Sequence, residues 1–151
     1  MTAGGEVEQE LGIAEVAALT GLSQDTLRWY EREGLSPRVA RGSDGRRRYS
    51  RRQVGLLKLL MRLRRTGLST KEMRRFSQLI AGGAATHGQR LALLAAHRER
   101  ILAHIAELQA DLAALDDKVS YYRRLIEQGL DCDGAPIDAE TAVLQRARTA
   151  E

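Results

Sequence analysis

The sequence predicts a mainly α-helical protein in which a small N-terminal domain is followed by one long helix. The chain has 151 residues with only 2 prolines, and alanine, leucine, arginine and glutamate are abundant, a composition that favours helices. Residues 1–82 carry 16 Lys and Arg against 9 Asp and Glu, whereas residues 83–151 carry 8 against 11. The N-terminal part is therefore where a polyanion would bind. A basic surface that is merely solvated is the alternative.

The cysteine content and the hydropathy indicate the compartment. The single cysteine, Cys132, excludes a disulfide within the chain and fits a reducing environment. The first ten residues are acidic and contain no apolar core of signal-peptide length. No stretch approaches the roughly 18 apolar residues of a membrane span. We therefore expect a cytoplasmic protein that has no membrane partner.

Two short helices separated by a turn are expected near the N-terminus. Apolar residues recur at helical intervals from Gly12 to Leu19, and a Thr-Gly-Leu sequence then interrupts the pattern. Ser23 is a suitable N-cap for a second helix that extends to Glu33, and Gly34 is well placed to end it. These features together are typical of a helix-turn-helix, and a purely structural helical hairpin is the alternative interpretation.

A two-stranded projection, or wing, is expected after the second helix. The helical pattern stops at Leu35, and Asp44-Gly45 is typical of a hairpin turn, which Val39 and Tyr49 can flank as short strands. Five arginines lie in or beside the projection: Arg41, Arg46, Arg47, Arg48 and Arg51. Guanidinium groups match phosphate oxygens in geometry and charge, so we interpret the wing as a phosphate-binding element. A solvated basic loop is the alternative.

Two capping boxes indicate two further helices. They begin at Ser50 and Ser69 and predict helices over 51–65 and 70–81. The apolar residues of these helices are more simply explained as core than as a ligand site. With the preceding elements they define a winged helix-turn-helix DNA-binding domain over residues 11–82.

A heptad pattern follows a glycine-containing hinge at 83–88 and predicts a dimerisation helix over 89–129. With Leu91 at position a, nine of eleven a and d positions are aliphatic, and a helix of about 40 residues would extend roughly 60 Å. A narrow apolar stripe on such a helix needs a partner, so we expect a homodimeric coiled coil. Its predicted contact residues are Leu94, Ile101, Ile105, Leu108, Leu112, Leu115, Val119, Tyr122 and Ile126.

The heptad pattern alone leaves the strand direction open. It also allows a hairpin within one chain, although no glycine or proline breaks residues 89–128. The remaining segment, 130–151, is expected to form a turn-rich loop and a short helix capped by Asp138 that packs weakly or frays.

Three sequence motifs resemble those of the MerR family of transcription regulators. Residues 26–35 (TLRWYEREGL) are similar to the recognition-helix signature, residues 45–50 (GRRRYS) to the wing motif, and residues 64–69 (RRTGLS) to the connection into the fourth helix. The resemblance covers about residues 11–79 in order and with matching spacing. It implies a homodimer on double-stranded, pseudo-palindromic promoter DNA, with dimer helices that cross as an antiparallel coiled coil.

The resemblance also implies DNA-contacting residues. The candidates for base edges in the major groove are Gln24, Asp25, Arg28 and Trp29. The candidates for phosphate contacts are Thr26, Tyr30, Arg41, Arg46, Arg47 and Arg48. Tyr49 belongs to the same DNA-binding set, although Arg47 and Tyr49 have a structural role in the wing as an alternative.

Family members act on promoters whose −35 and −10 elements are too far apart for RNA polymerase, and they distort the spacer at a deformation cost that protein contacts repay. By resemblance, one bound dimer would repress without effector and activate with it, through two dimer shapes.

The signal is expected to be a small-molecule effector and not a metal. Metal-sensing relatives hold their ion with several cysteines, whereas Cys132 is alone here, with Asp131 and Asp133 as weak assistants. His97 and His104 are two helical turns apart, too far to share one ion, and are interpreted as flanking the dimer seam. Residues 118–122 resemble the aldehyde-responsive branch of the family, but residues 58–64 lack that branch's cysteine in the third helix. No cofactor and no metal are therefore expected.

Two competing functions remain. An architectural protein that bends DNA without any effector would share the same domain, and a coiled-coil interaction protein would not bind DNA at all. An enzyme is not expected, because the sequence contains no nucleophile–base pair, phosphate loop or paired carboxylate motif.

Overall fold

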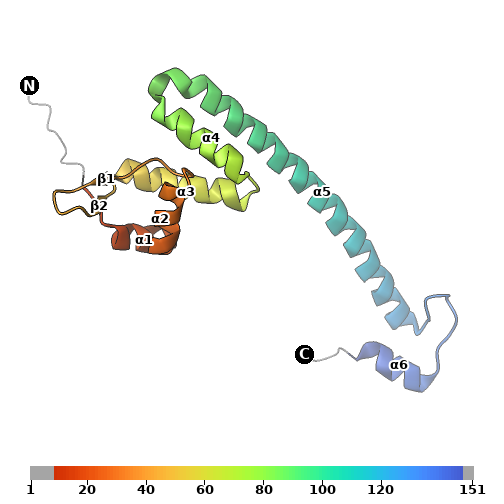
Figure 1. The fold of residues 1–151 in the computed structure, drawn as a ribbon. Helices are drawn as coiled ribbons and strands as arrows, with labels where there is room; N and C mark the ends of the chain where they lie inside the picture. The colour runs from red at the N-terminus through yellow and green to blue at the C-terminus, as the bar shows by residue number, and fades with distance from the viewer. Residues whose placement is uncertain (1–8, 148–151) are drawn as a thin grey trace, which may run out of the picture. The chain divides into compact units, whose positions relative to one another are not determined.

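The computed structural model describes residues 9–147, in which helices dominate and one two-stranded sheet forms the wing (Figure 1). The elements are α1 (Ile13–Thr20), α2 (Gln24–Arg32), β1 (Ala40–Arg41), β2 (Arg47–Arg48), α3 (Arg51–Arg65), α4 (Thr70–Ala81), the 3₁₀ helix η1 (Gly83–Thr86), α5 (His87–Gln128) and α6 (Ala139–Arg146). The predicted fold class, a winged helix-turn-helix followed by a long helix, is confirmed. The chain forms two compact units that divide within α5, between Glu99 and Arg100. The last four residues of the predicted segment 130–151 lie outside the described part.

The helix-turn-helix depends on local hydrogen bonds at its turn. The hydroxyl of Thr20 donates to the carbonyl of Val16 (2.7 Å) and accepts from the backbone N–H of Leu22 (3.3 Å). Gly21 adopts φ +73°, a left-handed conformation that residues with a Cβ rarely adopt. The Ser23 hydroxyl then accepts from the N–H of Thr26 (3.0 Å) and caps α2, as predicted.

The wing is a β-hairpin in which Ala40 pairs with Arg48 and Arg41 with Arg47. Its turn lies at the predicted position, since the N–H of Gly45 donates to the carbonyl of Gly42 (2.9 Å). The strands expected at Val39 and Tyr49 are displaced by one residue toward the turn. The reason is that Val39 donates its N–H to a side chain of α2, and Tyr49 pairs with Leu11 instead, through two backbone hydrogen bonds of 2.8 Å.

Both predicted capping boxes are present, at the starts of α3 and α4. Helix α3 contacts both α1 and α4 and lies between them (Figure 1). The apolar faces meet in one core, which consists of Val16, Leu27, Tyr30, Leu35, Tyr49, Val54, Leu57, Leu60, Leu63, Leu68, Met73 and Phe76. Leu93 and Leu94 at the start of α5 also pack against this core.

In the second unit, α5 continues without a break to Gln128 and is followed by a loop and α6. The loop is held by specific hydrogen bonds, whereas α6 has no buried residue and leaves Val143 and Leu144 69% and 68% exposed, as expected of a weakly packed helix. The side-chain amide of Gln145 donates to the carbonyl of Leu130 (2.8 Å), and the hydroxyl of Tyr121 donates to the carbonyl of Cys132 (2.8 Å). Asp138 caps α6 as predicted. Among residues 9–147, no helix is long and apolar enough to cross a membrane.

Candidate nucleic-acid interface

Helix α2 has one buried face and one polar, accessible face. Leu27 and Tyr30 point into the core, where they are 2% and 4% exposed. On the other face, the guanidinium of Arg28 lies 2.8 Å from the Asp25 carboxylate and 3.3 Å from the Gln24 amide oxygen. These three predicted base-contacting residues therefore lie together and hold one another in an extended, ordered arrangement.

The other predicted residues of α2 are less accessible. Trp29 is half-buried against the core, and the guanidinium of Arg64 lies 5.7 Å from its ring centroid in a cation–π contact. Thr26 is half-buried, and its hydroxyl is 2.8 Å from the hydroxyl of Ser23. Because Tyr30 is almost fully buried, the structure places it in the core rather than on the surface of α2.

Glu31, which the sequence analysis did not single out, joins α2 to the wing. Its carboxylate accepts from Nε of Arg47 (2.7 Å) and from the backbone N–H of Val39 (3.2 Å). The ion pair is largely shielded, with side-chain exposures of 20% for Arg47 and 16% for Glu31. The only hint in the sequence is that Glu31 lies between Arg28 and Arg32 on the same helix. In the structure, Arg47, a predicted phosphate contact, is paired with Glu31 and links the wing to α2.

The tip of the wing presents the remaining arginines. Arg46 has 82% of its side chain exposed, and Arg41 donates to the carbonyl of Gly45 (2.8 Å). Arg48 pairs with the Asp44 carboxylate at 3.0 Å. The backbone N–H of Arg46, together with the guanidinium groups of Arg48 and Arg46, holds the pKa of Asp44 below its usual value. The carboxylate therefore stays ionised and orders the turn between the arginines.

Tyr49 lies in the core, with 1% of its surface exposed. Burial raises the pKa of its phenol, and within residues 9–147 its hydroxyl has no hydrogen-bond partner. This placement leaves Tyr49 almost no surface through which it can reach DNA in this conformation.

A basic depression of about 480 Å³ separates α2 from the wing. Its lining residues are Arg28, Glu31, Arg32, Arg38 and Arg47. Four guanidinium groups around one carboxylate make a site that favours anions, and phosphate oxygens fit their geometry. Arg32 and Arg38 are cations of this surface that the sequence analysis did not select, although both lie close to the recognition signature.

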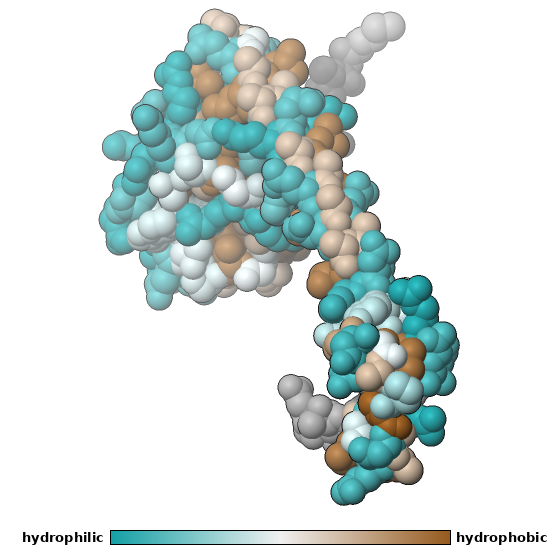
Figure 2. Space-filling model, turned by 90° about the vertical axis from the view of Figure 1, so that its right-hand side faces the viewer, coloured by the Kyte–Doolittle hydropathy of each residue, from teal (hydrophilic) through white to brown (hydrophobic). Residues whose placement is uncertain are grey.

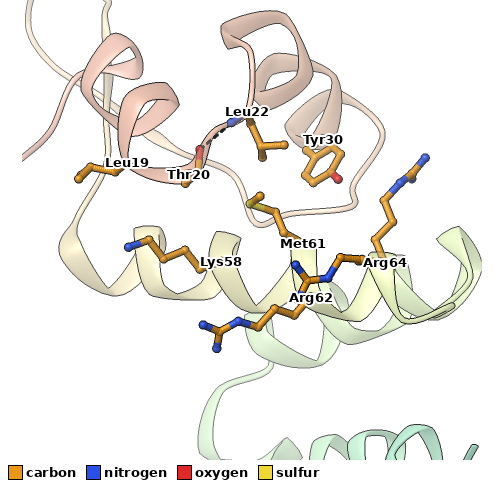
Figure 3. A pocket seen from close by; sticks show the side chains of 9 residues that line it. Leu19, Thr20, Leu22, Tyr30, Lys58, Met61, Arg62 and Arg64 are labelled. Atoms are coloured by element: carbon orange, nitrogen blue, oxygen red, sulfur yellow. Dashed lines mark hydrogen bonds between the residues drawn. The ribbon is translucent and has the colours of Figure 1, made fainter. Parts of the chain in front are cut away.

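A second, larger groove of about 650 Å³ lies between the helix-turn-helix and α3. In Figure 3, Met61 points from α3 toward Leu22 and Tyr30, while Lys58 and Arg62 extend from the same helix. The groove therefore combines apolar and basic lining residues.

The predicted dimerisation residues are exposed along the second unit. Figure 2 shows apolar residues in a band along α5. Six of the predicted positions are 44–63% exposed: Ile105, Leu108, Leu112, Leu115, Val119 and Tyr122. Leu94, Ile101 and Ile126 are only partly exposed, and Leu94 contacts the core of its own DNA-binding domain.

The loop, α6 and the end of α5 line an open pocket of about 390 Å³. Its walls are mainly apolar, with Tyr122, Leu125, Leu130, Ile137 and Leu144 among them, and Cys132 lies at its edge. Within residues 9–147, no group of three or more His, Cys, Asp or Glu side chains is arranged to hold a metal ion.

The sequence matches the family described as "MerR HTH family regulatory protein" over residues 11–79, and the one described as "MerR, DNA binding" over residues 54–118. It is 36% identical to a helix-turn-helix-type transcriptional regulator of Haemophilus influenzae over 74% of this chain and 82% of that protein. It is 35% identical to the regulator AdhR of Bacillus subtilis over 61% of this chain and 66% of AdhR.

A solved structure shows the same fold in a complex. The chain superposes with a TM-score of 0.70 and 34% identity on HiNmlR, described as a MerR family regulator that lacks the sensor domain and is bound to promoter DNA. The match covers 80% of this chain and 96% of HiNmlR.

Proposed function

The chain belongs to the MerR family of DNA-binding transcription regulators, and from this we propose that it acts as a homodimer that distorts promoter DNA in response to a non-metal effector. The observation that carries the proposal is the joint presentation of Gln24, Asp25 and Arg28 on α2 beside an arginine-rich wing. A helix with such a polar face fits the major groove, and a basic wing fits the flanking phosphates.

The contacts to DNA divide into two kinds. Gln24, Asp25, Arg28 and the accessible edge of Trp29 are proposed to read base edges. The proposed phosphate contacts are Thr26, Arg41, Arg46 and Arg48, together with the basic depression lined by Arg32 and Arg38. Tyr30, Arg47 and Tyr49 support these residues from beneath, because they are buried or paired within the domain.

The exposed apolar residues of α5 support the homodimer. Six aliphatic or aromatic side chains at heptad spacing, each about half exposed, are costly to leave in water and are relieved by a second copy of the helix. With two recognition helices fixed in one dimer, bending and undertwisting of the DNA between them would realign the promoter for RNA polymerase.

The effector is proposed to bind in the apolar pocket of the second unit. The volume of about 390 Å³ lies in the range of small-molecule sites. The donor set argues against a metal, because one thiol with neighbouring carboxylates lacks the several soft ligands that a thiolate metal site uses. The pocket lies on the dimerisation helix, so a ligand there can change the shape of the dimer.

Footprinting of the purified protein on the DNA upstream of its own gene tests the proposal. We expect protection of a pseudo-palindromic site between the promoter elements, and transcription by RNA polymerase that changes when the spacer is lengthened or shortened by one base pair. The rival, an effector-independent architectural protein, predicts equal affinity for unrelated duplexes and no dependence on spacer length. Protection without sequence preference would favour that rival.

A further inference from the structure

His97 is a buried polar residue in the third turn of α5, with 2% of its surface exposed. Its spacing predicts that it flanks the dimer seam, whereas the structure buries it inside its own chain. Its Nε2 atom lies 2.8 Å from the hydroxyl oxygen of Thr66, which ends α3. The two residues are 31 positions apart in the sequence, so this bond joins the DNA-binding domain to the dimerisation helix.

The direction of this hydrogen bond follows from the other contacts of Thr66. Its hydroxyl lies 2.8 Å from the carbonyl oxygen of Arg62 and 3.2 Å from that of Leu63. A carbonyl only accepts, so the single hydroxyl proton of Thr66 points to the backbone of α3. Nε2 of His97 is then the donor to Thr66, and the imidazole extends the hydrogen-bonded end of α3.

The last turn of α3 also contacts the recognition helix. Arg64 stacks on the ring of Trp29, two residues before the C-cap Thr66. One helical turn thus carries a contact to α2 through Arg64 and a contact to α5 through Thr66. The nearby Leu93 and Leu94 pack against the core but are apolar and impose no specific direction.

We propose that His97 is a positioning residue that fixes the angle between the recognition helix and the dimerisation helix through its hydrogen bond to Thr66. The inference rests on the proposed function, because the angle matters only if α5 joins two recognition helices. About 31 residues of α5 follow His97, or roughly 45 Å of helix, so a tilt of about 5° at this point moves the far end by about 4 Å. That distance is comparable with one base-pair step of DNA. His97 therefore determines which half-site spacing the dimer accepts.

Four variants separate a directional bond from simple packing. Thr66→Val and His97→Leu remove the acceptor and the donor while they keep most of the volume. Thr66→Ser and His97→Gln are the matched controls, since serine keeps the hydroxyl and the glutamine amide nitrogen can replace Nε2 as donor. Thermal unfolding of each variant verifies that the domain is folded.

The readout is the affinity for duplexes selected from a randomised pool by the wild-type protein, each then rebuilt with one base pair added to or removed from the centre. A single half-site duplex serves as reference. For Thr66→Val and His97→Leu we expect the preference for the selected spacing to fall by about three- to tenfold, the range of one hydrogen bond, with unchanged half-site affinity. The two control variants should keep the wild-type preference.

An imidazole ¹⁵N NMR spectrum tests the bond without DNA. In the wild-type protein it should show a proton on Nε2 of His97 that exchanges slowly, and in Thr66→Val this proton should exchange rapidly. An unchanged spacing preference in Thr66→Val overturns the positioning role, and so does an equal loss of affinity for every spacing and for the half-site. If the wild-type protein selects no paired half-sites, the proposed function fails, and this inference fails with it.

Discussion

Leu60 and Met73 of the N-terminal unit expose none of their surface, whereas Leu115 of the second unit exposes 63%. The first unit thus closes a core within one chain, through contacts between helices that are distant in sequence. In the second unit, a long helix exposes its apolar as well as its polar residues to solvent. The comparison indicates that the fold of the N-terminal unit is specified by its own residues, while the exposed apolar residues of α5 agree with the proposed partner helix.

The wing belongs to the N-terminal unit, but its strands, like the second unit, are not held by a hydrophobic core. Its two strands have two residues each, and in place of a core they are fixed by Glu31 and Asp44. Substitutions in these three regions should therefore differ in kind as well as in size.

The largest effect is expected from charges in the dimer seam. Ile105→Glu combined with Leu112→Glu places two carboxylates per chain where apolar contacts are proposed, and burying unpaired charge is strongly unfavourable. We expect the dimer dissociation constant to rise by about 100-fold or more. Sedimentation velocity over a range of concentrations measures the change.

The matched control is Ala103→Glu combined with Ala110→Glu. These alanines are exposed on α5 outside the seam, and glutamate keeps a high helix propensity there. This control should remain dimeric. A seam variant that sediments as a dimer like the control contradicts the assignment of the seam.

A core deletion should act differently. Leu60→Ala removes a fully buried side chain from α3, and such a cavity lowers the free energy of unfolding by about 2–5 kcal/mol. Because the core is complete within one chain, the loss should not depend on protein concentration. Urea denaturation at two protein concentrations measures the free energy of unfolding. Replacement of the half-exposed Leu19 by alanine is the control. A loss for Leu60→Ala that disappears at high concentration would mean that the N-terminal unit also depends on the partner.

The sequence predicts most of the fold because its signals are local. Ser23, Ser50 and Ser69 cap helices where they were expected, since a cap depends on residues within one turn. The long helix α5 was also predicted, because its apolar periodicity is a local signal as well. The bonds that join distant segments were not, because nothing in the local pattern of Glu31 or His97 identifies a partner 16 or 31 residues away.

The candidate site was predicted with less detail than the fold. The sequence identifies the arginines that belong to the wing, but it does not give their environments. Arg46 and its neighbour Arg47 differ, since Arg46 is exposed and Arg47 is paired with Glu31. The difference arises because Arg46 lies in the turn, whereas Arg47 begins β2 and reaches Glu31 of α2, and the strand boundaries were themselves displaced by one residue. The burial of Tyr30 and Tyr49 likewise depends on tertiary packing.

An intermediate effect is expected from loosening the wing. Glu31→Gln keeps an acceptor for the N–H of Val39 but removes the charge that holds Arg47, and a shielded charge-assisted bond contributes about 1.5–3 kcal/mol. We expect faster hydrogen exchange at Val39 and a DNA affinity that is lower by about three- to tenfold. Glu33→Gln, on the same helix but with weaker pairs at 3.4 and 3.6 Å, is the control. Equal exchange at Val39 in both variants contradicts the role of Glu31.

The smallest effect is expected at the tip of the wing. Arg46 is 82% exposed and contributes little to the core, so Arg46→Ala should leave the unfolding free energy almost unchanged. If it contacts phosphate, its loss releases about one counterion fewer on binding. The slope of log affinity against log salt should then become shallower by about 1, equally for all DNA sequences. Fluorescence anisotropy titrations at several salt concentrations measure this slope.

Arg28→Ala is the comparison, since the loss of a base-contacting residue should instead reduce discrimination between sequences. Identical salt slopes for Arg46→Ala and the wild-type protein would show that the wing tip does not contact phosphate. The phosphate contacts would then be made by the paired arginines nearer α2.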